Sequence, residues 1–238
     1  GFAETRGTLF FDVAEILRRY QPKAFFLENV KGLAIHDKGK TLKTILNTLD
    51  EVGYIVPEPQ IVNAMFFGVP QHRERIYIVG FRKDLGLTAE DFSYPEQKEV
   101  TKKWIDVREE MPVPAKYYLS TTYQQTLIKH KARHAAKGNG FGYDIIPDDG
   151  IAHAIVVGGM GRESNLVIDF RQKDLTPTTN IKGTVNTDGW RKMTPREWAR
   201  LQGYPDNFKI VVADASAYKQ FGNSVAVPAI QATATQLL

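Results

Sequence analysis

The chain contains no cysteine in its 238 residues. This absence excludes disulfides, thiolate metal sites and a thiol nucleophile within the chain. Long hydrophobic runs are also missing, because the longest, such as 76–80, are far shorter than the roughly 20 residues that a membrane-spanning helix needs. No signal-peptide pattern opens the sequence. The chain begins with Gly1 instead of Met, and residues 1–7 read like a loop inside a protein, so we expect a piece of a longer polypeptide.

Two motif classes are absent as well. Neither the Gly-x-x-x-x-Gly-Lys of a P-loop nor the Gly-x-Ser-x-Gly of a nucleophile elbow occurs, which argues against an α/β nucleotide-binding hydrolase. The five histidines show no ligand spacing beyond His130 and His134, so no metal site is expected. A net charge of +4 permits a polyanionic partner without demanding one.

The N-terminal third alternates between helix and strand patterns. Apolar residues recur at helical spacing over 9–20 and 42–49, and 24–27 is a short apolar run that predicts a buried parallel strand. Further strands are expected over 54–62 and 76–80. This rhythm predicts an α/β fold with part of a doubly wound, Rossmann-like sheet, in which ligands lie beyond the carboxyl ends of the strands.

The pattern changes between about residues 86 and 189. Glycine, proline and short β-branched runs replace helical periodicity there, which predicts a smaller, loop-rich and mostly β lobe. Thr194 to Glu197 forms a capping-box sequence, and a final helix is expected over 227–238. We therefore expect domains at 1–85 and 86–189, with 190–238 returning to the first.

Three polar segments are candidates for chemistry. If 71–75 enters a strand, Gln71, Arg73 and Arg75 share one face, and two guanidiniums there can anchor phosphate or carboxylate. The alternative is a solvated strand end with an Arg–Glu pair. Glu28 ends the first strand and is a candidate acid, although it can equally cap a helix or pair with Arg75. Residues 222–224 offer backbone N–H groups to a ligand before the last helix, or simply cap it.

The order of five segments is more informative than any one of them: Arg6–Asp12, Glu28–Val30, Gln71–Arg75, Thr194–Pro205 and Gln220–Val225. Together they closely resemble the motifs of the DNA cytosine-C5 methyltransferase family, in family order. The variable interval before Thr194 also has about the expected size. The resemblance covers essentially the whole chain except that interval.

The resemblance implies roles for individual residues. Glu28 corresponds to the acid that bonds the target cytosine, and Asn29 shapes the same pocket. Arg75 would contact the base near its O2, and Arg73 would support the pocket or a phosphate. The methyl donor is S-adenosylmethionine, and the target base is flipped out of duplex DNA. The donor contacts carried over are Leu9, Asn223 and Ser224.

By the same resemblance, residues 86–189 form the target-recognition domain, which reads base edges in the major groove. Arg162, beside the glycines of 158–161, is a candidate for reading bases. Thr176 lies where the family contacts a phosphate. A basic stretch including Lys129, Lys131 and Arg133 is a candidate DNA contact or, equally, a solvated amphipathic helix.

Two expected parts of the family are missing from this sequence: the Gly-rich donor-binding motif and the Pro-Cys nucleophile. In the favoured interpretation, preceding residues or a companion subunit supply them, and the protein is a bacterial restriction-modification enzyme of the cytoplasm. The alternatives are an inactive remnant and a DNA-binding module of the same fold.

Overall fold

The computed structural model describes residues 5–158, 160–176 and 183–237, without the side chains of residues 5–8. The chain divides into two compact units. The first unit is Gly1–Asn63, Glu74–Lys98 and Ala229–Leu238, and the second is Ala64–Arg73 and Glu99–Pro228. These units divide the chain differently from the expected boundaries at 85 and 189, since most of the C-terminal region packs within the second unit. The functional domain boundaries stay a prediction.

The first unit is built on one antiparallel sheet. β5 (Glu74–Arg82) lies in its middle and pairs with β1 (Ala24–Val30), β2 (Tyr54–Ile55) and β3 (Gln60–Asn63). The predicted parallel direction of 24–27 is therefore wrong, because β1 runs antiparallel to β5. The strand predicted over 54–62 is split into β2 and β3, and the prolines between them cannot donate to a ladder.

Both faces of this sheet are covered. Helices α1 (Thr5–Tyr20) and α2 (Lys40–Glu51) contribute Leu17 and Leu49 to a core that includes Ile76 and Ile78 of β5. The alternate residues of β5, such as Val79, pack into a second cluster. Side chains alternate between faces along a strand, so burial of both faces explains the continuous apolar run of 24–27. The α/β fold class is confirmed.

The second unit has little strand. β4 (Gln71–His72) pairs in parallel with β6 (Ala152–His153), and β7 (Leu166–Ile168) pairs antiparallel with β8 (Trp190–Lys192). Its longest element is a helix, α3 (Thr121–Ala135), so the expected loops are present but helix exceeds strand. The other helices are α4 (Pro195–Leu201), α5 (Asp214–Asn223) and α6 (Val227–Thr235), the last of which starts in this unit.

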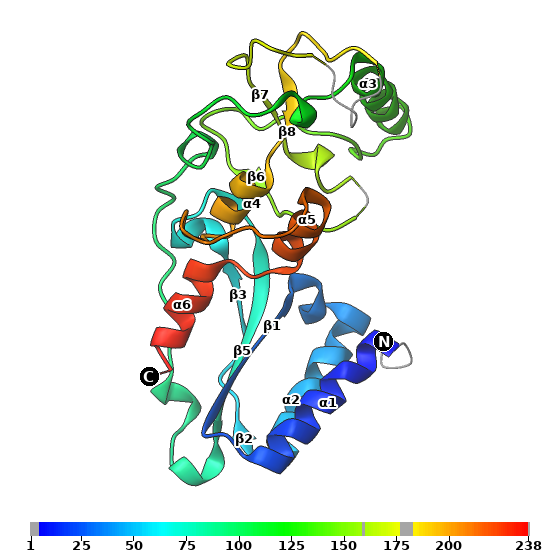
Figure 1. The fold of residues 1–238 in the computed structure, drawn as a ribbon. Helices are drawn as coiled ribbons and strands as arrows, with labels where there is room; N and C mark the ends of the chain where they lie inside the picture. Colours follow the sequence, from blue (N-terminus) through cyan, green and yellow to red (C-terminus); the bar gives the residue numbers. More distant parts are fainter. Residues whose placement is uncertain (1–4, 159, 177–182, 238) are drawn as a thin grey trace. The chain divides into compact units, whose positions relative to one another are not determined.

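The core of the second unit surrounds α4. Trp198 and Leu201 of this helix are buried with Trp104 and Phe221. Thr194 Oγ1 accepts a hydrogen bond from Glu197 N at 3.1 Å, and Glu197 Oε2 accepts one from Thr194 N at 2.8 Å. The predicted capping box is thus confirmed. Figure 1 shows these elements along the chain.

None of the helices among the described residues is both long and apolar enough to traverse a bilayer.

Short 3₁₀ helices make up most of the remaining regular structure. The 3₁₀ helices are η1 (Lys31–Ala34), η2 (His36–Gly39), η3 (Ala64–Phe67), η4 (Lys83–Leu85), η5 (Ala89–Asp91), η6 (Trp104–Asp106), η7 (Ala115–Tyr117) and η8 (Glu163–Asn165).

Candidate functional site

A carboxylate and a guanidinium meet at one end of the first unit's sheet. Glu28 lies near the end of β1, and Arg75 enters the neighbouring β5. Arg75 Nε lies 3.1 Å from Glu28 Oε1, and their side chains are 16% and 24% exposed, respectively. The ion pair between Glu28 and Arg75, which the sequence indicates as one alternative for Glu28, is therefore present. A half-buried carboxyl group oriented by a guanidinium can accept hydrogen bonds from a polar ligand at this edge when it is ionised, and can donate one when it is protonated.

Asn29 follows Glu28 and is exposed. Its Oδ1 accepts a hydrogen bond from Val30 N at 2.8 Å, which orients the amide along its own backbone. Its predicted role in shaping a pocket stays a prediction.

Arg73 lies in a different compact unit from Arg75, so their predicted joint anchor stays a prediction. The Arg73 side chain is buried in the second unit. Its guanidinium donates to Ile155 O at 3.0 Å and to Ser224 O at 2.6 Å. These bonds favour the supporting role suggested for Arg73 over a direct phosphate contact.

Two buried glutamines make further hydrogen bonds to the main chain that Arg73 contacts. Gln71 Oε1 accepts from Ile155 N at 3.0 Å, and its Nε2 donates to Gln202 Oε1 at 3.1 Å and to Leu201 O at 2.8 Å. Gln202 in turn donates to Phe221 O at 2.8 Å and Ser224 O at 3.2 Å. The network fixes Ile155 and Ser224 by their main chains. The sequence pattern gives no signal for Gln202, which is a polar residue directly after the last residue of α4.

The sequence predicts that residues 222–224 offer backbone N–H groups to a ligand just before the last helix. In the structure, residues 222 and 223 instead belong to the end of α5. Asn223 is the last residue of α5, and Ser224 N donates to Phe221 O at 3.2 Å as part of the helix end. Ser224 Oγ lies 2.6 Å from Tyr204 Oη, whereas Asn223 is exposed. Leu9, the third predicted donor contact, is 61% exposed on α1 of the first unit. Its position in a shared donor site stays a prediction.

The loop that begins after Ile155 packs closely against the end of α5. A Cβ on Gly222 would lie 2.7 Å from Val157 Cγ2 and 3.2 Å from Val157 N. Within the loop, a Cβ on Gly161 would lie 2.3 Å from Val156 O. Both glycines therefore permit contacts that no larger residue allows. Gly159 lies outside the described residues.

The predicted DNA contacts of the second unit are mostly exposed. Arg162 is exposed, with its Cζ 5.3 Å from the centre of the Tyr218 ring. On α3, Lys129 and Arg133 are exposed, while Lys131 Nζ lies 4.7 Å from the centre of the Tyr143 ring. The helix buries Gln124 and Leu127, so it is amphipathic and leaves a basic face exposed.

Thr176 is exposed, and its hydroxyl donates to Asp174 Oδ1 at 2.5 Å. The Asp174 carboxylate also accepts from Thr176 N at 3.0 Å, and these bonds lower the pKa of Asp174. Residues 177 and 178, which follow Thr176 in the same Thr-Pro-Thr run, lie outside the described residues.

A buried ionic network that the sequence did not predict organises the second unit. Arg191 is fully buried and donates to Glu197 through Nη1 and Nη2, both at 2.8 Å, and through Nε to Asp169 Oδ2 at 3.0 Å. Asp169 also accepts from Arg171 Nη2 at 2.7 Å. Burial raises the pKa of Asp169, but hydrogen bonds from Arg171 and the charge of Arg191 outweigh burial and hold that pKa well below its usual range.

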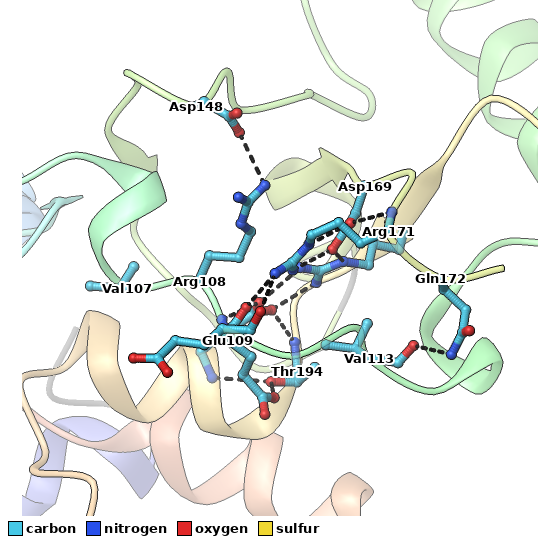
Figure 2. Close-up of polar contacts among 12 residues, drawn as sticks. Val107, Arg108, Glu109, Val113, Asp148, Asp169, Arg171, Gln172 and Thr194 are labelled. Atoms are coloured by element: carbon cyan, nitrogen blue, oxygen red, sulfur yellow. Dashed lines mark hydrogen bonds and ion pairs between the residues drawn. The ribbon is translucent and has the colours of Figure 1, made fainter.

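Figure 2 shows how the segment around Glu109 joins this network. Arg171 Nη1 donates to Glu109 O at 2.8 Å, and Thr194 Oγ1 donates to Glu109 Oε1 at 2.5 Å. Segments far apart in the sequence, around residues 109, 170 and 194, are thereby held together. Among the described residues, no group of three or more His, Cys, Asp or Glu side chains is placed to hold a metal ion.

Comparison with known proteins gives one consistent result. The model of the family described as C-5 cytosine-specific DNA methylase matches residues 1–238. The chain is 72% identical over 239 residues to the type II methyltransferase M.HpaII of Haemophilus parainfluenzae, covering 100% of this chain and 66% of that protein. It is 42% identical to M1.ScrFI of Lactococcus lactis subsp. cremoris, covering 100% of this chain and 57% of that protein. The chain thus spans about three fifths of these relatives.

The fold has solved counterparts. The crystal structure of S. pombe Dnmt2 methyltransferase aligns with a TM-score of 0.67 and 20% sequence identity, covering 98% of this chain and 72% of that one. The Entamoeba histolytica methyltransferase EhMeth gives the same TM-score at 19% identity, covering 100% of this chain and 71% of that one.

Proposed function

Because the chain belongs to the C-5 cytosine-specific DNA methylase family, we propose that it carries the base-binding and DNA-recognition part of a cytosine-C5 methyltransferase. The proposed enzyme methylates a flipped cytosine in a specific duplex site, in the bacterial cytoplasm. The Glu28–Arg75 pair at the end of the sheet supports this proposal, because the polar edge of a pyrimidine can bind both an acid and a cation, and these two side chains lie 3.1 Å apart.

The chemistry explains what each group contributes. C5 of cytosine is a weak nucleophile until a nucleophile adds to C6 and makes the ring enamine-like. Glu28 bonds N3 and the 4-amino group and offsets charge that builds on the ring during this addition. Arg75 orients the Glu28 carboxylate and faces the O2 side of the base. Asn29 shapes the same pocket.

The attacking thiolate must come from elsewhere, because this sequence has no cysteine. We propose that it is supplied by a segment outside this sequence or by a companion chain. S-adenosylmethionine supplies the methyl group when it is bound.

Three residues are proposed to contact S-adenosylmethionine, and their side chains are chemically suited to that role. The exposed side chain of Leu9 offers an apolar contact, and the exposed amide of Asn223 offers hydrogen bonds. The hydroxyl of Ser224 is oriented by Tyr204. Arg73 and Gln202 hold the Ser224 main chain, so we assign both to positioning this turn.

For DNA recognition we propose the loop ending at Arg162, with Thr176 and the basic face of α3 as further contacts. The exposure of Arg162, Lys129 and Arg133 supports this assignment, as does the anchoring of the loop at Ile155. Lys131 is assigned to the same basic face.

Methyl transfer from labelled S-adenosylmethionine to DNA tests the proposal. The chain is assayed alone and after addition, as a separate polypeptide, of the part of M.HpaII that lies outside the region matched by this chain. Incorporation only in the mixture is expected. No incorporation in either case, with sequence-specific DNA binding retained, would support the alternatives, an inactive remnant or a DNA-binding module.

A further inference from the structure

Three cations of the second unit line one pocket. Lys116 follows the start of η7, Arg162 precedes η8, and Lys192 ends β8, so three separate segments converge there. The pocket has a volume of about 580 Å³. The start of α5 completes its wall with Asp214 and Ala215.

Each of these cations lies beside a tyrosine ring. A ring attracts a cation through its quadrupole and holds its position without cancelling its charge. The flexible lysine and arginine side chains are therefore kept near the pocket with their charge still available. The distances to the ring centres are 4.9 Å for Lys116 and Tyr117, 5.1 Å for Lys192 and Tyr123, and 5.3 Å for Arg162 and Tyr218.

Two carboxylates balance only part of this charge. Asp214 Oδ2 lies 2.7 Å from Lys116 Nζ, and Glu163 Oε1 lies 3.0 Å from Lys192 Nζ. Arg162 has no ion-pair partner within the part of the chain that the structure describes. Three positive and two negative side chains leave the pocket with an excess positive charge, and the cation without an ion-pair partner among the described residues, Arg162, is exposed.

The direction of the Lys192 side chain is fixed by its buried neighbour in β8, Arg191. Arg191, its neighbour in β8, is fully buried between Asp169 and Glu197, and side chains alternate along a strand. Lys192 must then point away from that network, and its side chain is 21% exposed at the pocket. The cation is pre-positioned, which lowers the entropic cost of binding an anion.

We propose that this pocket seats a backbone phosphate of duplex DNA, with Lys116, Lys192 and Arg162 as its cations. The inference rests on the proposed function for the identity of the partner. It assigns Arg162 to the phosphate instead of a base edge, because Arg162 shares the pocket with two lysines. A phosphate seated beside the loop that ends at Arg162 sets the register in which that loop meets the bases.

Duplex binding as a function of salt tests the proposal. The full chain is titrated with a fluorescein-labelled duplex of mixed sequence, and fluorescence anisotropy is recorded over a series of salt concentrations. The double variant K116Q/K192Q should bind several-fold more weakly at low salt, with the slope of log K against log salt reduced by about 1. R162Q should weaken all duplexes by a similar factor.

Two controls separate charge from folding. K116R/K192R keeps both charges and should restore the wild-type slope. Lys209→Gln removes an exposed lysine outside the pocket and should leave the slope unchanged. Thermal unfolding of each variant checks that the second unit remains folded.

The proposal is overturned if the wild type binds the duplex while K116Q/K192Q, correctly folded, keeps its slope and affinity. It is equally overturned if K116Q/K192Q loses only the binding of inorganic phosphate, which would make the pocket a small-anion site. Failure of the proposed enzyme function appears separately, as absent methyl transfer by a mixture that still binds DNA.

Discussion

Arg75 reaches across two antiparallel strands to Glu28, with 3.1 Å between Nε and Oε1. The two side chains approach from neighbouring strands, so the guanidinium defines how the carboxylate faces the edge of the sheet. Any ligand of Glu28 therefore meets a carboxylate with one oxygen already engaged.

Glu28→Gln should lower methyl transfer by about 10²- to 10⁴-fold, because the amide keeps the shape but cannot act as an acid toward the base. The rate is measured with labelled donor in the complemented enzyme, and DNA affinity should stay within a few-fold of wild type. Glu58→Gln, an exposed glutamate of the same unit, is the matched control. An unchanged rate in the Glu28 variant would make that residue purely structural.

Arg73→Met should destabilise the second unit by about 1–3 kcal/mol, since the carbonyls of Ile155 and Ser224 would lose a charged donor. The salt dependence of DNA binding should stay unchanged, because the buried guanidinium is engaged by the main chain. Urea unfolding and anisotropy titrations measure the two effects, with the exposed Arg19→Met as control. A reduced salt slope without loss of stability would restore the phosphate role.

Acid should destabilise the second unit through Asp169. Its pKa is lowered in the folded state, so its stabilisation is fully present above the unfolded pKa of about 3.9 and is lost as the pH falls below that value. Asp169→Asn should be less stable at neutral pH and should show a flatter decline in acid. Urea unfolding between neutral pH and pH about 3 measures this, with exposed Asp149→Asn as control. Parallel pH curves for wild type and Asp169→Asn would contradict the assignment.

Gly222→Ala should displace the loop at Val157, because the added Cβ would lie 2.7 Å from Val157 Cγ2. Helix propensity alone would favour alanine in α5, so a loss of stability of about 1–3 kcal/mol reports the clash. DNA affinity should fall as well. Gly140→Ala has no atom within 4 Å of its new Cβ and is the control. Equal stability of both variants would show that the loop yields without cost.

The sequence predicted local features well. The capping box at Thr194 and the helices α1 and α2 depend on interactions within a few residues, which a sequence pattern records directly. The sequence also indicates the Glu28–Arg75 pair as one alternative, because both residues lie at strand ends.

Other features depend on contacts that no local pattern encodes. The apolar run of 24–27 reports burial on both faces, which parallel and antiparallel strands share, so it could not give the direction of β1. The alternation of side chains puts Arg73 on one face with Arg75 only if a single strand runs through both residues. The structure ends β4 at His72 and starts β5 at Glu74, which breaks the alternation at Arg73.

The buried network around Arg191 was invisible for a similar reason. Its partners Asp169 and Glu197 are separated from Arg191 by 22 and 6 residues, and a charged residue in a basic segment is ordinarily exposed. The pocket could not be predicted from the sequence either, because its three cations come from distant parts of the chain.

The alternation of Arg191 and Lys192 along β8 has a consequence for folding. A slip of one residue against β7 would bring the lysine between Asp169 and Glu197 and turn the arginine outward. An ammonium cannot reproduce the forked bonds that the guanidinium makes to Glu197, so the shifted pairing leaves buried carboxylates poorly matched. The ionic cluster therefore fixes the register of β8 against β7. Only the correctly paired strands present Lys192 at the surface of the second unit.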